Sequence, residues 1–181
     1  GVFNPVTLGF TNVVLVGDVF SSGILDPNGN VTLVPNTTSA NLVSFSPALG
    51  TYSNVVRIGA DGTFVTGVGL TNGNVVCVPG TNANVVQFDP IAKTVSNSVN
   101  LGASGTLKFV GAVLAPNGNV VCLPGASGNV GVFKPPSTWS NVQTNASGFL
   151  GGSLAVDGRI VFGPGTGSNV GLFDPVTLTF S

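Results

Sequence analysis

Residues 109–135 read FVGAVLAPNGNVVCLPGASGNVGVFKP. An apolar run over 110–115 reaches a turn at Pro116-Asn117-Gly118, and a second run over 119–124 follows it. Asn-Gly between two short apolar runs is the strongest short-range signal for a β-hairpin, since both central residues of a type I′ turn need positive φ. A third run over 129–133 ends before Pro135, which cannot donate to a further ladder. The stretch therefore predicts a tight hairpin followed by a third strand.

The same pattern recurs along nearly the whole chain. Each copy opens with a phenylalanine, has a glycine at its turn, closes its second run with a proline and ends its third run with Phe-x-Pro. The opening phenylalanines are Phe20, Phe64, Phe109 and Phe149, and the turn glycines are Gly29, Gly73, Gly118 and Gly158. The period is about 40 to 45 residues, the range in which propeller blades fall.

Each period contains four short β-branched runs and no helical periodicity. In the third copy these runs are 110–115, 119–123, 129–133 and 138–144. Four antiparallel strands make a sheet with two apolar faces, which radial stacking against similar sheets can bury. We therefore predict an all-β fold, a β-propeller or partial propeller built from four-stranded antiparallel blades.

The repeat also predicts how the chain is divided. Four blades are expected at 17–63, 64–108, 109–148 and 149–181. Residues 1–16 resemble only the outer two strands of a blade, because Phe3-Asn4-Pro5 matches Phe173-Asp174-Pro175. This half blade, and the absence of Met, indicate a segment of a larger propeller. In the alternative, residues 1–16 pack on a four-bladed body or on a neighbouring chain.

The repeat unit is similar to a known class of repeats. GAVLAPNGNVVCLPGASGNVGVFKP and VGLTNGNVVCVPGTNANVVQFDP resemble kelch-like or WD40-like propeller repeats, and more narrowly resemble repeats in uncharacterised phage and giant-virus virion or fibre proteins. The unit lacks the double glycine with spaced Tyr and Trp of kelch and the Trp-Asp pair of WD40. The resemblance implies a propeller and a structural setting, but little about activity, because propellers host many unrelated functions.

Composition limits the partners of the chain. It is 43% hydrophobic and only 6% charged, with a net charge of -1, so it offers no basic surface for nucleic acid or anionic lipid. No apolar run approaches the roughly 18 residues of a membrane helix, so we expect no membrane insertion. The polar remainder, rich in Asn, Ser, Thr and Gly, favours contacts with other protein subunits through hydrogen bonds.

The sequence is poor in catalytic residues. It contains no His and no Glu, so a nucleophile has no obvious activating base. Asp26, Asn28 and Asn30 have the spacing of half a calcium loop, but the closing Glu is absent. We therefore expect no enzyme, and no catalytic, cofactor or metal site.

Cys77 and Cys122 occupy the same slot in adjacent repeats, four residues after the turn glycine. Leu33 and Phe162 fill that slot in the other two copies. Matching strands of stacked sheets lie about 10 Å apart, which is beyond the reach of a disulfide. We expect two free, buried thiols.

Trp139 and Tyr52 are the only residues of their types, and both fall on predicted fourth strands. An exposed aromatic ring beside Asn and Ser could hold a sugar, so both are candidate ligand contacts. The alternative is that each ring caps a sheet face.

Two functions fit this sequence. The first is a structural or interaction module of a virion (phage fibre, tail or capsid decoration) or of a cell-surface assembly, with an extracellular or virion location. The second is a lectin-like propeller that binds surface glycan. Neither requires a cofactor.

Overall fold

The computed structural model describes residues 2–7, 9–12, 19–37, 41–58, 62–102, 107–126, 128–144 and 147–181. Within these residues all regular structure is β-strand, and every strand pair is antiparallel. The described strands form four four-stranded sheets and one two-stranded hairpin. The predicted all-β architecture of four-stranded antiparallel blades is confirmed.

The four large sheets are called blades 1 to 4 in chain order, and in each of them consecutive strands are neighbours. Blade 1 comprises β3(Phe20–Leu25), β4(Val31–Pro35), β5(Asn41–Ser46) and β6(Thr51–Arg57); blade 2 comprises β7(Phe64–Gly69), β8(Val75–Pro79), β9(Asn84–Asp89) and β10(Thr94–Asn100). Blade 3 comprises β11(Phe109–Leu114), β12(Val120–Pro124), β13(Asn129–Lys134) and β14(Thr138–Gln143); blade 4 comprises β15(Phe149–Leu154), β16(Ile160–Pro164), β17(Gly171–Asp174) and β18(Thr179–Phe180). The separate hairpin is β1(Val2–Asn4) with β2(Gly9–Thr11).

The hairpin predicted at Pro116-Asn117-Gly118 is present, but its turn is of a different type. The Gly118 amide donates to the Ala115 carbonyl at 2.9 Å, and the Ala115 amide donates to the Asn119 carbonyl at 2.8 Å. Gly118 has φ 81°, whereas Lys93 and Leu178 are the only described non-glycine residues with positive φ. This is the geometry of a type I turn followed by a glycine bulge. In such a turn proline suits the second position, here Pro116, and only the last position, here Gly118, needs positive φ. The prediction of a type I′ turn was wrong because it ignored Pro116.

The core lies between the blades rather than within any one of them. All five residues of β12 are buried. Val120 and Cys122 belong to the apolar cluster shared with blade 2, whereas Val121 and Leu123 belong to the cluster shared with blade 4. Alternation along the strand therefore divides its side chains between two neighbours. Each inner blade is stabilised by the blades on both of its sides.

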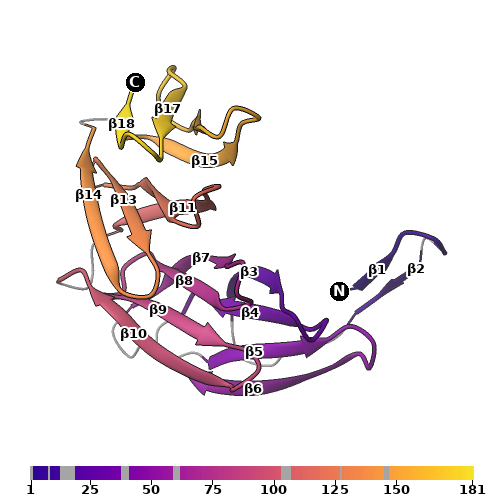
Figure 1. Cartoon of the computed structure of the whole chain (residues 1–181). Coiled ribbons are helices and arrows are strands. Elements are labelled where there is room, and N and C mark those ends of the chain that lie inside the picture. Colours follow the sequence, from indigo (N-terminus) through magenta and orange to yellow (C-terminus); the bar gives the residue numbers. More distant parts are fainter. Residues whose placement is uncertain are drawn as a thin grey trace.

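The blades are arranged as an open arc (Figure 1). The first strands of successive blades, β3, β7, β11 and β15, contact one another in order. The fourth strand lies at the edge of each sheet farthest from the first strand. Blade 1 and blade 4 form the two ends of the arc, and hairpin β1–β2 is held away from the blades (Figure 1).

Hydrogen bonds from side-chain amides to proline carbonyls link successive blades. The acceptors are the Pro90, Pro136 and Pro175 carbonyls, each in the turn before a fourth strand. The bonds are Asn28 Nδ2 to Pro90 O at 3.4 Å, Gln87 Nε2 to Pro136 O at 2.6 Å, and Asn117 Nδ2 to Pro175 O at 3.0 Å. Each bond ties one blade to the outer turn of the next blade.

Hairpin β1–β2 has the turn of an outer blade hairpin. Asn4 Oδ1 accepts from the Val6 and Thr7 amides at 2.9 and 3.1 Å. Asp174 Oδ1 accepts from the two corresponding amides of blade 4 at 2.8 and 3.1 Å. Asn and Asp form such turns because their side-chain oxygen reaches the backbone two residues on. The assignment of this hairpin to a half blade of a larger propeller stays a prediction.

Phe133 tests whether the clusters between blades stabilise the fold. Its side chain is 0% exposed in the cluster between blades 2 and 3. Phe133→Ala should lower the free energy of unfolding by about 3–5 kcal/mol, because it removes buried apolar surface and leaves a cavity. Denaturant titration measures the loss. Val176→Ala, at a side chain that is 78% exposed, is the control and should change it by less than about 0.5 kcal/mol. Equal losses of unfolding free energy in the two variants would show that the cluster around Phe133 does not stabilise the fold.

Candidate functional site

A polar groove lies at the junction of blades 1 and 2, with a volume of about 260 Å³. It is called the Tyr52 groove. Blade 1 contributes its hairpin turn and its two outer strands, and blade 2 contributes its outer turn. The lining residues are Asn28, Asn30, Ser44, Ser46, Leu49, Thr51, Tyr52, Ser53, Val55, Phe88, Pro90 and Lys93.

An equivalent groove of about 440 Å³ lies at the junction of blades 2 and 3 and is called the Val95 groove. Its lining residues are Asn72, Asn74, Gln87, Asp89, Thr94, Val95, Ser96, Pro135 and Pro136. Tyr52 is paired with Phe45, and Val95 is paired with Phe88 in the same register one blade later. The two grooves are therefore copies of one feature of the repeat, and they differ in having an aromatic or an aliphatic side chain at this position.

The Tyr52 groove is suited to an uncharged ligand rich in hydrogen-bonding groups. Amide and hydroxyl side chains both donate and accept hydrogen bonds, and the tyrosine ring adds a flat apolar face with a polar tip. Tyr52 is 38% exposed. Lys93 is the only charged residue among those that line the groove. The arrangement can hold a polar loop of another protein or a sugar.

Trp139 occupies the corresponding register position in blade 3, opposite Phe133, but it lies differently. Its ring packs on Phe109 with centroids 5.5 Å apart, and its Nε1 donates to Asn141 Oδ1 at 2.8 Å. The side chain is partly buried against the cluster between blades 2 and 3. The structure thus places the two candidate residues in different settings: Tyr52 lines a groove and Trp139 packs on a blade. Ligand contact by either residue stays a prediction.

Sequence reasoning missed the polar residues that surround Tyr52. Asn28 and Asn30 were considered only as part of a calcium loop and Ser53 was not considered, although the repeat register could have found all three. Each lies one blade before an equivalent polar residue of the Val95 groove, namely Asn72, Asn74 and Ser96.

The Asp26 carboxylate is engaged by its own turn. Asp26 is 6% exposed, and its Oδ1 accepts from the Asn28 and Asn30 amides at 2.8 and 3.2 Å. The spacing that suggested half a calcium loop therefore forms a local turn, as Asp commonly does. In the described part of the chain no three His, Cys, Asp or Glu residues come together in a way that could hold a metal.

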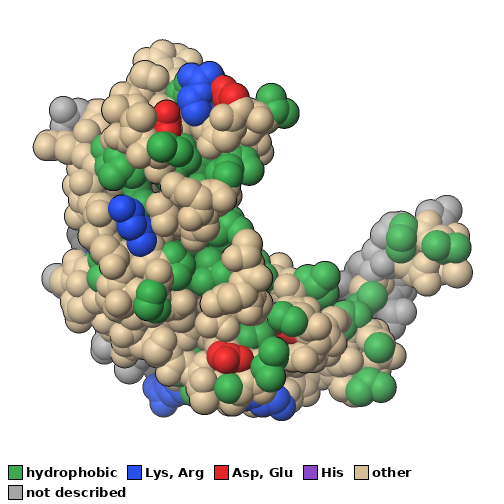
Figure 2. Space-filling model, viewed as in Figure 1, with side chains coloured by type: hydrophobic (Ala, Val, Ile, Leu, Met, Phe, Trp, Pro, Cys, Tyr) green, Lys and Arg blue, Asp and Glu red, His purple; other side chains and the backbone are tan. Residues whose placement is uncertain are grey.

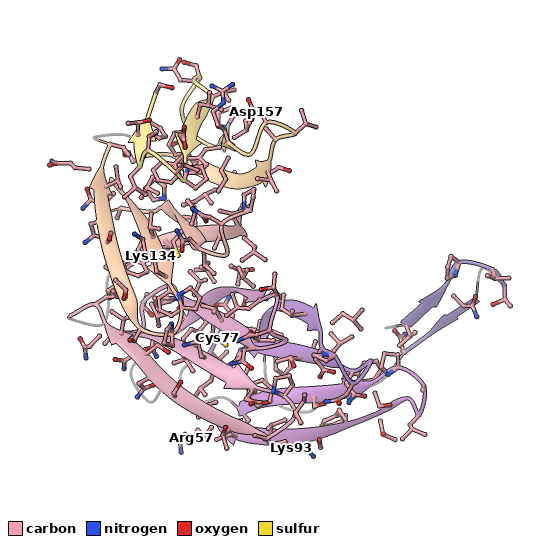
Figure 3. All side chains as sticks on the ribbon, viewed as in Figure 1. Arg57, Cys77, Lys93, Lys134 and Asp157 are labelled. Atoms are coloured by element: carbon pink, nitrogen blue, oxygen red, sulfur yellow. The ribbon has the colours of Figure 1, made fainter. Side chains whose placement is uncertain are left out.

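Charged side chains are few and scattered over the face shown in Figure 2. Arg57 and Lys93 lie at the outer margin of the arc (Figure 3). Arg159 bonds Asp157 at 2.6 Å, and this hydrogen bond lowers the pKa of the Asp157 carboxyl. Both partners are well exposed, so the pair contributes little to stability. The polar groups of this face are therefore mainly uncharged ones.

Cys77 and Cys122 are free and buried, which confirms the sequence prediction. Cys77 lies between sheets (Figure 3). Burial raises the pKa of the Cys77 thiol to about 12 and also raises the pKa of the Cys122 thiol, because the interior disfavours the charged thiolate. Neither thiol is ionised at neutral pH, so neither is a ready nucleophile.

The chain matches no family model, and no curated protein sequence matches it. It is similar in structure to several solved proteins. One is virginiamycin B lyase from Staphylococcus aureus, at 10% identity and a TM-score of 0.65, with 88% of this chain and 53% of that one covered. Another is YCF48 bound to D1 peptide, at 16% identity and a TM-score of 0.65, with 94% and 55% covered. A third is an extracellular domain of the hybrid two-component system BT3049 from B. thetaiotaomicron, at 11% identity and a TM-score of 0.67, with 93% and 24% covered.

These likenesses establish a fold, namely that of β-propeller repeat proteins. The chain spans about half the length of the lyase structures that it matches. None of the three structures links the chain to a virus. No helix long and apolar enough to cross a membrane occurs among the described residues.

The expectation that the chain is not an enzyme was wrong, because it excluded a class of protein that shares this fold. It rested on the missing His and Glu. A lyase shares this fold, so the fold itself does not exclude catalysis. Enzymes and binding proteins with different site residues can occupy one propeller architecture.

The thiols provide a direct test of the packing between blades. At pH 8 the thiols of the folded protein should react with a thiol reagent only slowly, over many hours. The reason is that the pKa of both buried thiols lies far above that pH. Denatured, non-reduced protein should release the full signal of two thiols per chain. Rapid labelling of the folded protein would show that the clusters are open, and no signal after denaturation would show a disulfide.

Proposed function

We propose that this chain is an interaction module of an extracellular or virion assembly, and that it binds other protein subunits through the grooves between its blades. The observation that carries this proposal is the repetition of one polar groove at two successive blade junctions. Equivalent grooves on one arc repeat two asparagines and a serine of the register, and so can engage an extended partner at more than one point.

The comparisons support the coarser part of this proposal. YCF48 was solved with a bound peptide, and two-component systems of B. thetaiotaomicron contain similar extracellular domains. The finer part, a place in a phage fibre, tail, capsid decoration or cell-surface assembly, rests on the repeat resemblance and on the nearly uncharged surface. With only 6% charged residues, this surface suits close packing against neighbours that are also neutral.

Glycan binding is the second candidate function, and the Tyr52 groove favours it. A tyrosine ring beside Asn28, Ser44 and Ser53 provides both an apolar face and hydrogen-bonding groups in one groove. The Val95 groove lacks the ring, so lectin activity would be limited to one of the two junctions.

A photo-reactive amino acid placed at position 52 or position 95 tests the interaction module. In the native assembly both positions should cross-link to protein subunits, because both line equivalent grooves. Position 176, which is 78% exposed on an outer turn, is the matched control. The proposal fails if positions 52 and 95 yield no more cross-links than position 176.

Glycan binding is tested by array screening of the wild type, Tyr52→Ala and Val95→Ala. If sugar stacks on Tyr52, binding falls at least tenfold in Tyr52→Ala and is unchanged in Val95→Ala. Trp139→Ala is a further comparison, and circular dichroism must show that each variant folds. If the wild type binds no glycan on the array, the lectin function is contradicted. The protein-binding function is then decided by the cross-linking experiment.

A further inference from the structure

Three of the four blades place the same tetrapeptide, Asn-Gly-Asn-Val, at their first hairpin turn. We propose that the copy at Asn72-Gly73 is a site of spontaneous deamidation in the folded protein. The other two copies, at Asn28-Gly29 and Asn117-Gly118, are protected by the junctions between blades. The inference concerns the chemistry of the chain itself and does not rest on the proposed binding function.

Deamidation at an Asn-Gly pair requires only the chain and water. The Gly73 backbone nitrogen attacks the side-chain carbonyl carbon, Cγ, of Asn72, and the new C–N bond closes a succinimide ring. The side-chain nitrogen leaves as ammonia, together with the proton that the glycine nitrogen gives up. Water then opens the ring at either of its carbonyl carbons, giving aspartate or isoaspartate, with no oxidation or reduction. Glycine permits this attack best, because it has no Cβ and the widest choice of backbone angles.

The three Asn-Gly pairs occupy turns of one geometry. The amides of Gly29, Gly73 and Gly118 donate to the carbonyl three residues earlier at 3.0, 3.0 and 2.9 Å. The side-chain Oδ1 of Asn72 accepts from the amide two residues on at 3.0 Å, and that of Asn117 does so at 3.1 Å. The asparagine of every pair is exposed. Release of the glycine amide is therefore a step that all three pairs share, and it does not distinguish them.

The asparagine side chains differ in what they bond across the junctions. Asn28 Nδ2 donates to the Pro90 carbonyl at 3.4 Å, and Asn117 Nδ2 donates to the Pro175 carbonyl at 3.0 Å. Among the described residues, Asn72 Nδ2 has no acceptor in the next blade. Attack requires the side chain to rotate until Cγ faces the glycine nitrogen. Asn28 and Asn117 must give up a bond to the next blade in order to do so, and Asn72 need not.

Gln87 makes the bond at the junction where Asn72 does not. Its Nε2 donates to the Pro136 carbonyl at 2.6 Å. The equivalent residues of blades 1 and 3 are Ser44 and Val132, neither of which has an amide group. In those blades the asparagine of the turn bonds the next blade instead. The presence of Gln87 thus explains why one of three identical tetrapeptides is left unprotected.

The fold also requires glycine beside Asn72. Gly73 has φ 90°, and a Cβ at this position would lie 2.5 Å from Pro27 Cγ of blade 1. A residue that hinders ring closure is therefore excluded at position 73. For the same reason a control variant has to change Asn72 and not the glycine.

Deamidation would change the charge of one groove of the repeated pair. Asn72 lines the Val95 groove, where Asp89 is the only charged lining residue. Aspartate and isoaspartate are ionised at neutral pH, so the groove would gain a second negative charge. The Tyr52 groove keeps Asn28 and also has Lys93. The two grooves would therefore come to differ more strongly in charge.

Peptide mapping by mass spectrometry tests the proposal on the 181-residue protein. Trypsin separates the three pairs, because cleavage after Arg57 and Lys93 releases Asn72 on its own peptide. The protein is kept at pH 8, sampled over weeks and digested rapidly at mildly acidic pH. Asn72 should deamidate about two- to tenfold faster than Asn28 or Asn117, which is the effect expected of one hydrogen bond.

The denatured chain provides the internal control. In guanidinium the three pairs should react at similar rates, because their tetrapeptides are identical. Each native rate is divided by the denatured rate of the same pair, which removes the influence of the residue before the asparagine. Asn74, which precedes the β-branched Val75, should remain unmodified in the same peptide. Asn72→Ser should abolish the modification of that peptide.

Aspartate variants give a second readout that needs no incubation. Asp157 already occupies this turn position in blade 4, so aspartate fits the turn. Asn72→Asp should unfold at the same denaturant concentration as the wild type. Asn117→Asp should unfold at a lower one, because a carboxylate cannot donate to the Pro175 carbonyl.

Three results would overturn the proposal. The first is a normalised rate at Asn72 that is no higher than the rates at Asn28 and Asn117. The second is a folded protein in which Asn72 does not react at all. The third is an Asn72→Asp variant that is destabilised as much as Asn117→Asp.

Discussion

The structure depends on the packing of each sheet against sheets on both of its sides. β8 and β12 are buried over their full length, and their alternating residues serve two different clusters. A single four-stranded sheet has no layer of its own to cover its faces, so each blade depends on its neighbours. The burial of Cys77 and Cys122 at equivalent positions follows from building the chain out of one such unit.

The repeat also explains why candidate binding sites arise at the blade junctions. Every junction joins the outer strands of one blade to the outer turn of the next, and the asparagine and serine side chains there are repeated with the register. The two grooves differ at a few equivalent positions, with Tyr52, Ser44 and Ser46 in one and Val95, Gln87 and Asp89 in the other. Partner choice can therefore vary without a change in the packing that holds the blades together.

Much of the fold could be predicted from the sequence, because its signals are local and repeated. The Asn-Gly turns, the Phe-x-Pro endings and the slot shared by Cys77 and Cys122 indicated blades with cores between them. The turn type was mispredicted, since Pro116 directly precedes the Asn-Gly pair and occupies the second position of a type I turn. The grooves and the packed position of Trp139 depend on contacts between separate repeats, which no local pattern reports. Enzymes were wrongly excluded, because the repeat pattern determines the propeller fold and not the residues of a functional site.

The claim that the blades stabilise one another is tested by native-state hydrogen exchange. The slowest amides of β8 and β12 should exchange only through global unfolding, with one common opening free energy and one common denaturant dependence. Separate opening free energies for blades 2 and 3, each independent of the other, would contradict the claim.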